Sequence, residues 1–261
     1  MSLTNHLRLL EQPLLGTLFI RSYFRYKRHI EDPFHGLVRE HGELFAKGHV
    51  LDIGANIGYT STVFAQAIIE PYKVHAFEPE LKNMGLMERA LELYQRRHMV
   101  VCKQVAVGSI SGELTMWYNP NHHADHRVST GAFAVDADPH GRFFSVPEVS
   151  IDDYCESQGI ENEVAFIKMD VQGYELEVCR GMTRTIERNP REAVAVEYCP
   201  AAMEELGVDP KDLVEFFCSR DYDFYRLERG KDFEPIAPES LAEALGDKGY
   251  LDFVAIKRHQ G

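Results

Sequence analysis

The sequence predicts an α/β fold in which a mostly parallel, twisted sheet carries helices on both faces. Short apolar runs alternate with helical segments from residue 50 onward, an order typical of parallel strands joined by crossover helices. The first run breaks into a glycine-containing turn that opens a helix, and later runs end in a carboxylate. The last two runs, 223–227 and 250–256, are expected to pair at the far side of the sheet as an antiparallel edge.

The first strand and its turn are the most informative part of the chain, Val50-Leu51-Asp52-Ile53-Gly54-Ala55-Asn56-Ile57-Gly58. Residues 59–69 follow with a helical pattern. Glycines in such a turn let the backbone approach a ligand closely, because they have no β-carbon. A strand, a glycine turn and a helix start together predict a nucleotide-binding site.

The turn favours a nucleotide that has no phosphate. Asn56 takes the place of the middle glycine in the dinucleotide pattern G-x-G-x-x-G, and the phosphate-binding pattern G-K-[ST] is absent. S-adenosylmethionine is a ligand with a ribose but no phosphate. Glu78, which ends the second strand at 74–77, can accept hydrogen bonds from both ribose hydroxyls.

Further carboxylates follow later strands. The remaining strands and helices are expected at 81–95, 99–107, 164–169, 176–186, 193–196 and 210–219. Because parallel strands end at the same edge of a sheet, Asp170 and Glu197 should lie near the glycine turn. The predicted cofactor-binding residues are Asp52, Gly54, Asn56, Gly58, Glu78, Pro79, Val105 and Asp170.

Residues 109–150 interrupt the strand–helix rhythm and predict an inserted hairpin with a lid or substrate loop. Residues 113–118 and 146–151 have the pattern of its strands. Its polar part, with His122, His123, Asp125 and His126, could bind a metal, supply a general base or be a solvated loop. The spacing lacks the helical framing of a typical metal site, so no metal is assigned.

Composition narrows the function classes. The net charge of −13, from 28 basic and 41 acidic side chains, argues against nucleic acid as a partner. Five cysteines without a C-x-x-C pair indicate reduced thiols in a cytoplasmic protein. The apolar run 13–20 is too short for a membrane span, and it lacks the features of a signal peptide.

Residues 1–47 predict a helical N-terminal cap, and residues 48–261 form the main domain. A helix is expected to start at Pro13, and another at 34–45. The basic and aromatic stretch 21–28 could grip an anionic substrate or a membrane surface, but an amphipathic cap packed on the domain is favoured. Whether the protein forms a homodimer is left open.

Four segments resemble the FkbM family of S-adenosylmethionine-dependent methyltransferases, over roughly residues 48–200. They are the turn 51–58, the strand end Phe77-Glu78-Pro79, the stretch 150–154, and the fourth-strand motif 166–175. Asp125-His126-Arg127 resembles a motif found in part of the family. The chain departs from the family pattern at Gln172, where an acidic residue is more usual.

The resemblance implies a Rossmann-like class I methyltransferase that methylates a hydroxyl on a small molecule, such as a sugar or a natural product. The enzyme would align the acceptor with the cofactor, and a base would remove the acceptor's proton. The catalytic candidates are His126, Asp170 and Glu197. A non-catalytic S-adenosylmethionine-binding module or partner subunit and a nicotinamide oxidoreductase remain alternatives, although Asn56 argues against the latter.

Overall fold

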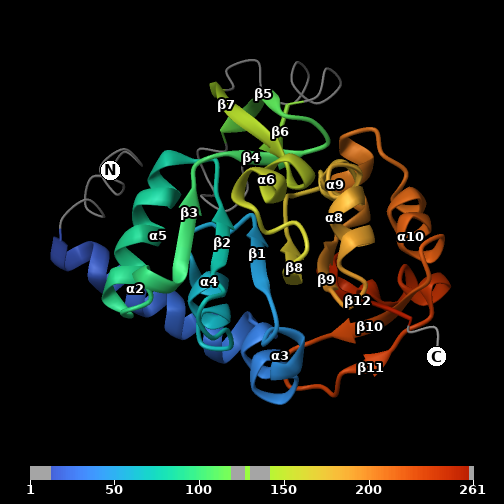
Figure 1. The fold of residues 1–261 in the computed structure, drawn as a ribbon, viewed down its shortest axis with the longest axis horizontal. Helices are drawn as coiled ribbons and strands as arrows, with labels where there is room; N and C mark the ends of the chain where they lie inside the picture. Colours follow the sequence, from blue (N-terminus) through green and yellow to red (C-terminus); the bar gives the residue numbers. More distant parts are fainter. Residues whose placement is uncertain (1–12, 119–126, 130–141, 259–261) are drawn as a thin grey trace.

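The computed structural model describes residues 13–118, 127–129 and 142–258. Its centre is an eight-stranded sheet with the strand order β11-β10-β12-β9-β8-β1-β2-β3 (Figure 1). The strands are β1 His49–Ile53, β2 Val74–Phe77, β3 Val100–Lys103, β8 Val164–Met169, β9 Ala193–Tyr198, β10 Tyr222–Leu227, β11 Glu234–Pro235 and β12 Leu251–Lys257. The expected α/β fold with a mostly parallel sheet is confirmed.

The antiparallel part of the sheet lies on the side of β9. Strands β1, β2, β3, β8 and β9 pair parallel, whereas β12 pairs antiparallel with both β9 and β10. The predicted pairing of the last two strands is therefore confirmed. β12 is internal, however, and the short strand β11 forms the edge.

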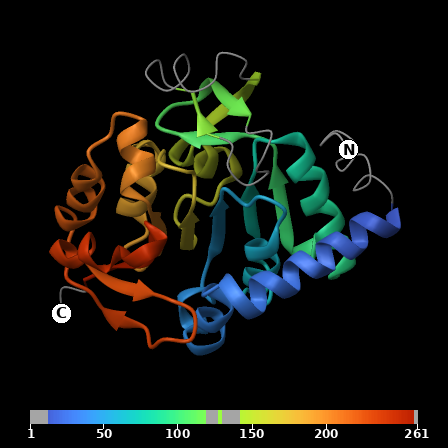
Figure 2. The ribbon, with the colours of Figure 1, turned by 180° about the vertical axis from the view of Figure 1, so that it is seen from behind.

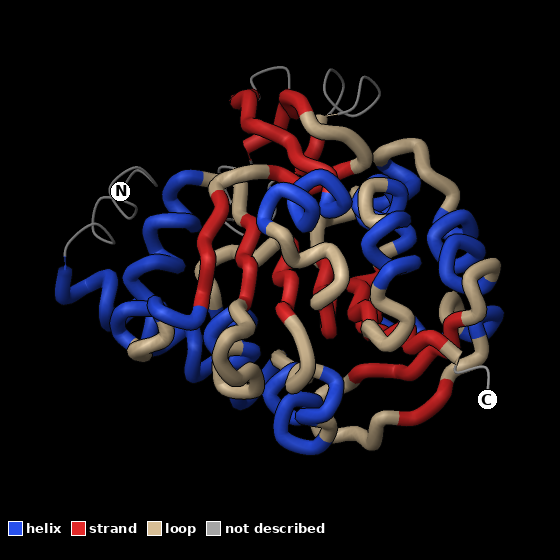
Figure 3. The backbone as a smooth tube through the Cα atoms, viewed as in Figure 1, coloured by secondary structure: helices blue, strands red, loops and turns tan. Residues whose placement is uncertain are grey.

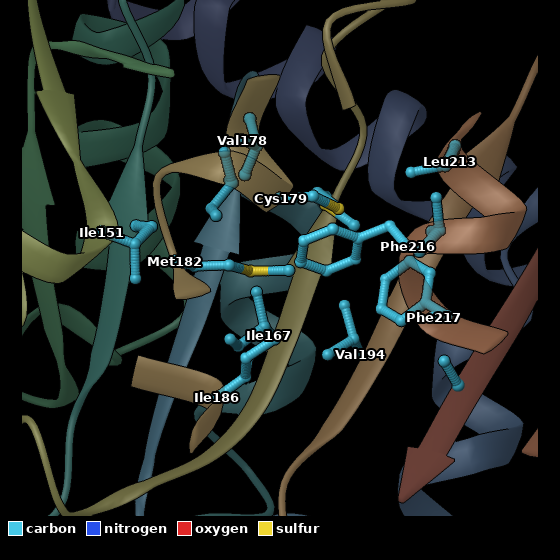
Figure 4. Packing of buried hydrophobic residues seen from close by; sticks show 14 of the residues in the cluster. Ile151, Ile167, Val178, Cys179, Met182, Ile186, Val194, Leu213, Phe216 and Phe217 are labelled. Carbon is cyan, nitrogen blue, oxygen red and sulfur yellow. The ribbon is translucent and has the colours of Figure 1, made fainter. Parts of the chain in front are cut away.

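Helices cover both faces of the sheet because strand residues point alternately to opposite faces. On β1, Val50 belongs to a buried cluster that includes residues of α2 Pro13–Tyr26, α3 Phe34–Glu40, α4 Tyr59–Phe64 and α5 Leu81–Leu93. Its neighbour Leu51 packs with the helices of the other face, α6 Ile151–Gln158, α7 Glu175–Arg180, α8 Thr183–Arg188, α9 Pro200–Glu205 and α10 Pro210–Cys218. Figure 4 shows part of this second core, where Phe216 and Phe217 of α10 lie close to Ile167 and Val194 of the sheet.

The N-terminal cap packs on the first of these faces. It consists of α2, a π-helical turn η1 at Lys27–Glu31, α3 and a 3-10 turn η2 at Gly42–Leu44. Figure 2 shows α2 as a long blue helix across the side of the molecule that is hidden in Figure 1. Ile20 and Phe24 are buried, while Leu14 and Leu18 on the same helix are exposed. The helix predicted from Pro13 onward is present as α2.

A second, four-stranded sheet stands above the carboxyl edge of the main sheet, as the separate red group at the top of Figure 3. Its order is β4-β7-β5-β6, with β4 Ala106–Gly108, β5 Gly112–Tyr118, β6 Arg127–Val128 and β7 Arg142–Ser150. The predicted hairpin strands correspond to β5 and β7, which pair antiparallel from Gly112 opposite Glu148 to Tyr118 opposite Arg142.

The prediction of a single strand at 99–107 is wrong. The chain pairs with β2 only as far as Lys103, and after Gln104 and Val105 it continues as β4 in the second sheet, beside β7. An apolar run in the sequence does not show which strand will provide its backbone partners, so one run was split between two sheets.

Several helix boundaries also differ from the prediction. α4 ends at Phe64, because residues after it close tighter turns in which Gln66 N donates to Val63 O and Ala67 N donates to Phe64 O. Ile69 and Leu81, two large apolar residues of the helical segments predicted at 59–69 and 81–95, are exposed. The helix expected at 176–186 is interrupted at Gly181, and α6 and α9 have no counterpart among the predicted elements.

Three short 3-10 turns complete the described elements. They are η3 Arg97–Met99, η4 Pro238–Ser240 and η5 Glu243–Lys248. The last two lie in the stretch between β11 and β12. None of the helices in the described ranges combines the length and the apolar character needed to cross a bilayer.

Candidate active site

The turn after β1 is held tightly against the neighbouring strand β8. Gly54 has φ +75°, and a β-carbon there would lie 1.9 Å from the carbonyl oxygen of Asp170. The backbone N–H groups of Gly54 and Ala55 both donate to Phe77 O, at 3.1 and 3.0 Å. Gly54 is thus required by the packing of the protein itself, at a point where the sequence suggested close approach of a ligand.

Two of the predicted cofactor-binding residues support the shape of the turn. Asp52 is fully buried and accepts hydrogen bonds from Thr60 Oγ1 at 2.7 Å and Ser61 Oγ at 2.5 Å, which fixes the start of α4. Gly58 has φ +80° and lies against Met87 of α5. Both residues shape the turn, and neither lines the clefts described below.

Glu78 is positioned by three hydrogen bonds at the end of β2. Its Oε2 accepts from the backbone N–H of Asn56 at 2.9 Å, and its Oε1 accepts from Glu80 N at 3.0 Å and Asn83 Nδ2 at 3.4 Å. Burial raises the pKa of Glu78 to about 7. The carboxylate at the end of β2 is therefore hydrogen-bonded directly to the glycine turn that follows the neighbouring strand β1.

A first cleft brings together most of the predicted cofactor-binding residues. Gly54, Asn56, Glu78, Pro79, Val105 and Asp170 all line it. Its opposite wall is apolar and comes largely from the second sheet, with Val107, Leu114, Met116 and Val128. The cleft has about 650 Å³ of space including its mouth. The apolar wall was not predicted as part of the site, although Leu114 and Met116 alternate with polar residues in the sequence.

Asp170 and Glu197 meet at the ends of β8 and β9. The side-chain amide of Gln172 bridges them, because its Nε2 donates to Asp170 Oδ1 at 3.0 Å and to Glu197 Oε2 at 3.1 Å. Gln172 holds this position with φ +55°, an unusual backbone conformation for a non-glycine residue. The bridge shows what the departure from the family pattern does, since an acidic residue here would place a third carboxyl beside the other two.

Lys168 is a buried cation that the sequence reasoning did not assign to the site. Its Nζ donates to the carbonyl of Gly54 at 2.8 Å and lies 3.5 Å from Asp52 Oδ1 and 3.6 Å from Asp170 Oδ2. It therefore joins the β1 turn to the end of β8. The available signal was a lysine in an otherwise apolar strand, two residues before a carboxylate that ends it.

The surroundings of the two carboxyls shift their pKa values in opposite directions. Burial raises the pKa of Asp170, but the Lys168 ammonium and the Gln172 amide outweigh it, so the pKa lies below its ordinary range. Burial and the nearby charge of Asp170 raise the pKa of Glu197 well above its ordinary range. Asp170 is therefore the stronger acid of the pair and Glu197 the weaker one.

A second, more polar pocket lies between the N-terminal cap and the sheet edge. It shares Gly54, Asn56 and Asp170 with the first cleft. The cap contributes Tyr23, Lys27, Glu31, Asp32, Pro33 and Phe34, and the sheet edge contributes Lys168, Met169, Glu197, Tyr250 and Asp252. The two spaces therefore both border the β1 turn and the start of the loop after β8.

Some predicted residues cannot be placed. His122, His123, Asp125 and His126 lie outside the described residues, so the base role of His126 stays a prediction and a metal at this stretch stays an open alternative. Within the described ranges, no group of three or more His, Cys, Asp or Glu side chains is arranged to hold a metal ion. The five cysteines are free thiols, and Cys155 and Cys179 are buried in the core.

Comparison with known proteins decides the family. The profile of the methyltransferase FkbM domain matches residues 52–224. The chain belongs to the FkbM methyltransferase family. Hexuronic acid methyltransferase AglP from Haloferax volcanii is a relative with 27% identity over 186 residues, which cover 70% of this chain and 67% of AglP.

Solved structures support the Rossmann-like methyltransferase fold. Methyltransferase FkbM from Methylobacillus flagellatus KT superposes with a TM-score of 0.50 and 18% identity, over 96% of this chain and 57% of that protein. This chain thus spans little more than half of that relative. The O-methyltransferase TomG from Streptomyces achromogenes, solved in complex with S-adenosylmethionine, has a TM-score of 0.52 and 11% identity, over 92% and 89% of the two chains.

The FkbM match contains the first cleft but only part of the second pocket. Glu78, Asp170, Gln172 and Glu197 lie inside residues 52–224. The cap residues and the β12 residues Tyr250 and Asp252 lie outside them. The second pocket therefore includes segments that lie outside the residues matched by the family profile.

Proposed function

We propose that this FkbM protein transfers a methyl group from S-adenosylmethionine to a hydroxyl of a small molecule, such as a sugar or a natural product. The observation that carries the proposal is the position of Glu78, whose carboxylate lines the first cleft and is hydrogen-bonded to the turn after β1. TomG, which shares the fold, binds S-adenosylmethionine, and AglP is a hexuronic acid methyltransferase.

The residues of the first cleft fit this cofactor. Glu78 would accept hydrogen bonds from the ribose hydroxyls, and Pro79, Val105 and the apolar wall would contact the adenine. Asn56 Oδ1 is buried and has no hydrogen-bond partner in the described part of the chain, so it is available to a ligand donor. Asp170 would attract the cofactor's amino group. When bound, S-adenosylmethionine would supply an activated methyl group.

The chain's own contribution to the reaction is to place the acceptor and to receive its proton. We propose the Asp170–Glu197 pair for the second task, because both carboxyls line the second pocket beside the β1 turn and a carboxylate can take up a proton from the acceptor hydroxyl. Gln172 holds the two carboxyls next to each other by donating a hydrogen bond to each. His126 remains a candidate base from the sequence, outside the described residues.

Calorimetric titration tests the cofactor assignment. The purified protein is expected to bind S-adenosylmethionine and S-adenosylhomocysteine at micromolar to sub-millimolar concentration and to ignore NAD. Absence of binding to either sulfur compound at millimolar concentration would contradict the proposal. Methyl transfer is then measured with the cofactor and a panel of hexoses, hexuronic acids and polyketide alcohols. Binding of the cofactor without transfer to any of them would favour the non-catalytic module.

A further inference from the structure

The second pocket is closed on its outer side by the N-terminal cap. Tyr23 and Lys27 face it from the end of α2 and the start of η1, and Glu31 follows at the end of η1. The opposite wall is the rim formed by Asp170, Glu197 and Asp252. A ligand in this space would therefore lie between the rim carboxyls and the cap.

Lys27 and Lys168 are the two cationic side chains among the described residues that line this pocket. Lys168 is 5% exposed and is engaged below the rim with two backbone carbonyls, Asp52 and Asp170. The side chain of Lys27 is 27% exposed, and its Nζ donates to Glu31 Oε1 at 2.5 Å. An ammonium group has three N–H donors, so Lys27 can hold a ligand oxygen while it keeps Glu31.

The local backbone fixes Lys27 at the pocket. Asp32 N donates to Lys27 O at 2.8 Å, which closes a π-helical turn after α2, and such turns occur frequently at functional sites. The buried side chain of Asp32 accepts hydrogen bonds from Phe34 N at 3.2 Å, His35 N at 2.9 Å and Tyr59 Oη at 3.1 Å. Because Tyr59 begins α4 directly after the β1 turn, the cap is tied to the turn itself.

The pocket offers different partners to a ligand hydroxyl or amino group and to a ligand carboxylate. Its rim offers carboxyls and hydroxyls, which can accept hydrogen bonds from ligand hydroxyl or amino groups. A ligand carboxylate would be repelled by Asp170 and finds a cationic donor only on the cap side. Burial lowers the pKa of Lys27, but Tyr23 and Glu31 outweigh burial, so the pKa stays above its ordinary value and the ammonium stays charged.

We propose that Lys27 binds a ligand carboxylate in the second pocket, so that the N-terminal cap forms part of the active site. The inference rests on the proposed function. The carboxylate could belong to the methionine end of the cofactor or to an acidic sugar acceptor, as the relationship to a hexuronic acid methyltransferase suggests. Both are the same chemical group, and binding experiments distinguish them.

The test compares Lys27→Met with Lys27→Arg, which keeps the charge, and with Lys211→Met, which removes an exposed lysine from α10. The probes are S-adenosylhomocysteine and 5′-methylthioadenosine, which lacks the amino-acid carboxylate. If Lys27 holds the cofactor, Lys27→Met weakens S-adenosylhomocysteine binding by about tenfold or more and leaves 5′-methylthioadenosine unchanged. Lys27→Arg is expected to keep most of the affinity, and Lys211→Met all of it.

The acceptor arm uses a hexuronic acid and the hexose that matches it except for the carboxylate. If Lys27 holds the acceptor, Lys27→Met leaves S-adenosylhomocysteine binding intact and raises the KM for the acid by about tenfold or more, with the hexose unaffected. Wild-type affinities and KM values in Lys27→Met would overturn the inference and leave the proposed function standing. An equal loss for both adenosine probes would also overturn it. A wild-type protein that binds neither probe would overturn the proposed function together with this inference.

Discussion

At the scale of single residues, the site depends on how a few buried charges are paired. The ammonium of Lys168 outweighs burial and lowers the pKa of Asp170, whereas burial and the charge of Asp170 raise the pKa of Glu197. Gln172 gives each carboxyl one N–H donor and adds no charge of its own. The pair therefore places a stronger and a weaker acid side by side, and we propose that it accepts the proton of the acceptor hydroxyl.

Glu78→Gln tests the ribose contact. The substitution keeps the size of the side chain but removes the charge, so S-adenosylhomocysteine binding is expected to weaken by about 1–3 kcal/mol, measured by calorimetry. Glu80→Gln is the matched control, because Glu80 caps α5 through Asn83 N at 2.7 Å and does not line the cleft. Equal affinities in the wild type and in Glu78→Gln would remove Glu78 from the site.

The same residue predicts a pH dependence of binding. Since burial raises the pKa of Glu78 to about 7, the carboxylate form that accepts ribose hydroxyls is lost as the pH falls below this value. Wild-type affinity for S-adenosylhomocysteine is therefore expected to be lower at pH 6 than at pH 8. The affinity of Glu78→Gln is expected to change less over this range, and a parallel change in both proteins would contradict the assignment.

At the scale of elements, two close backbone approaches set the shape of the site. One is the contact of the β1 turn with the end of β8 at Gly54. The other lies where the chain between α7 and α8 passes under the second sheet, at Gly181, whose β-carbon would lie 2.0 Å from Gly108 O. This contact holds β4 over the main sheet, and β4 supplies Val107 to the apolar wall of the first cleft.

Gly181→Ala tests this contact, with Gly85→Ala as its control. Gly181→Ala forces a backbone oxygen to move and is expected to lower the free energy of unfolding by about 1–3 kcal/mol. Gly85 lies within α5 and a β-carbon there meets nothing within 4 Å, so Gly85→Ala is expected to raise that free energy by about 0.4–1 kcal/mol. Urea denaturation measures both, and similar values for the two variants would show that the contact at Gly181 is unimportant.

At the scale of the whole molecule, cap and main domain share one core. Ile20 and Phe24 of α2 belong to the same buried cluster as Phe64 of α4 and Val74 of β2. The predicted division into a cap, residues 1–47, and a main domain, residues 48–261, stays a proposal. According to this proposal, the main domain binds the cofactor and the cap closes the second pocket. The shared core means that the cap is expected to stay in place during the reaction.

The stability of the whole fold depends on pH through buried acids far from the site. Burial raises the pKa of Glu192 from its ordinary 4.5 to about 7, although the hydroxyl of Tyr222 donates to it. The folded protein therefore keeps a proton that the unfolded chain releases. The contribution of Glu192 to stability is complete below about pH 4.5 and is lost as the pH rises through about 7.

Glu192→Gln isolates this effect. The buried bases His49 and His75 have lowered pKa values and act in the opposite direction as the pH falls below about 6.5, so the variant must be compared with the wild type at each pH. Between pH 6 and pH 8, the decrease in unfolding free energy is expected to be about 1 kcal/mol smaller in Glu192→Gln. Identical pH profiles by urea denaturation would show that Glu192 does not titrate in this window.

The sequence by itself determined the parallel sheet, the positions of Glu78, Asp170 and Glu197 at strand ends, and the family. These features are local: a buried strand, the turn after it and the carboxylate that ends it are neighbours along the chain. Strand 74–77 and strand 164–169 have the predicted bounds for the same reason.

Only the tertiary structure decided which of these residues share a pocket and what closes it. Lys27, Asp170 and Asp252 line one space although more than half of the chain separates the first from the last, and no local pattern records such a contact. The split of one apolar run between two sheets has the same cause, because backbone partners are chosen by the assembled fold. Charge pairing between buried groups depends on distances that exist only once the strands lie side by side.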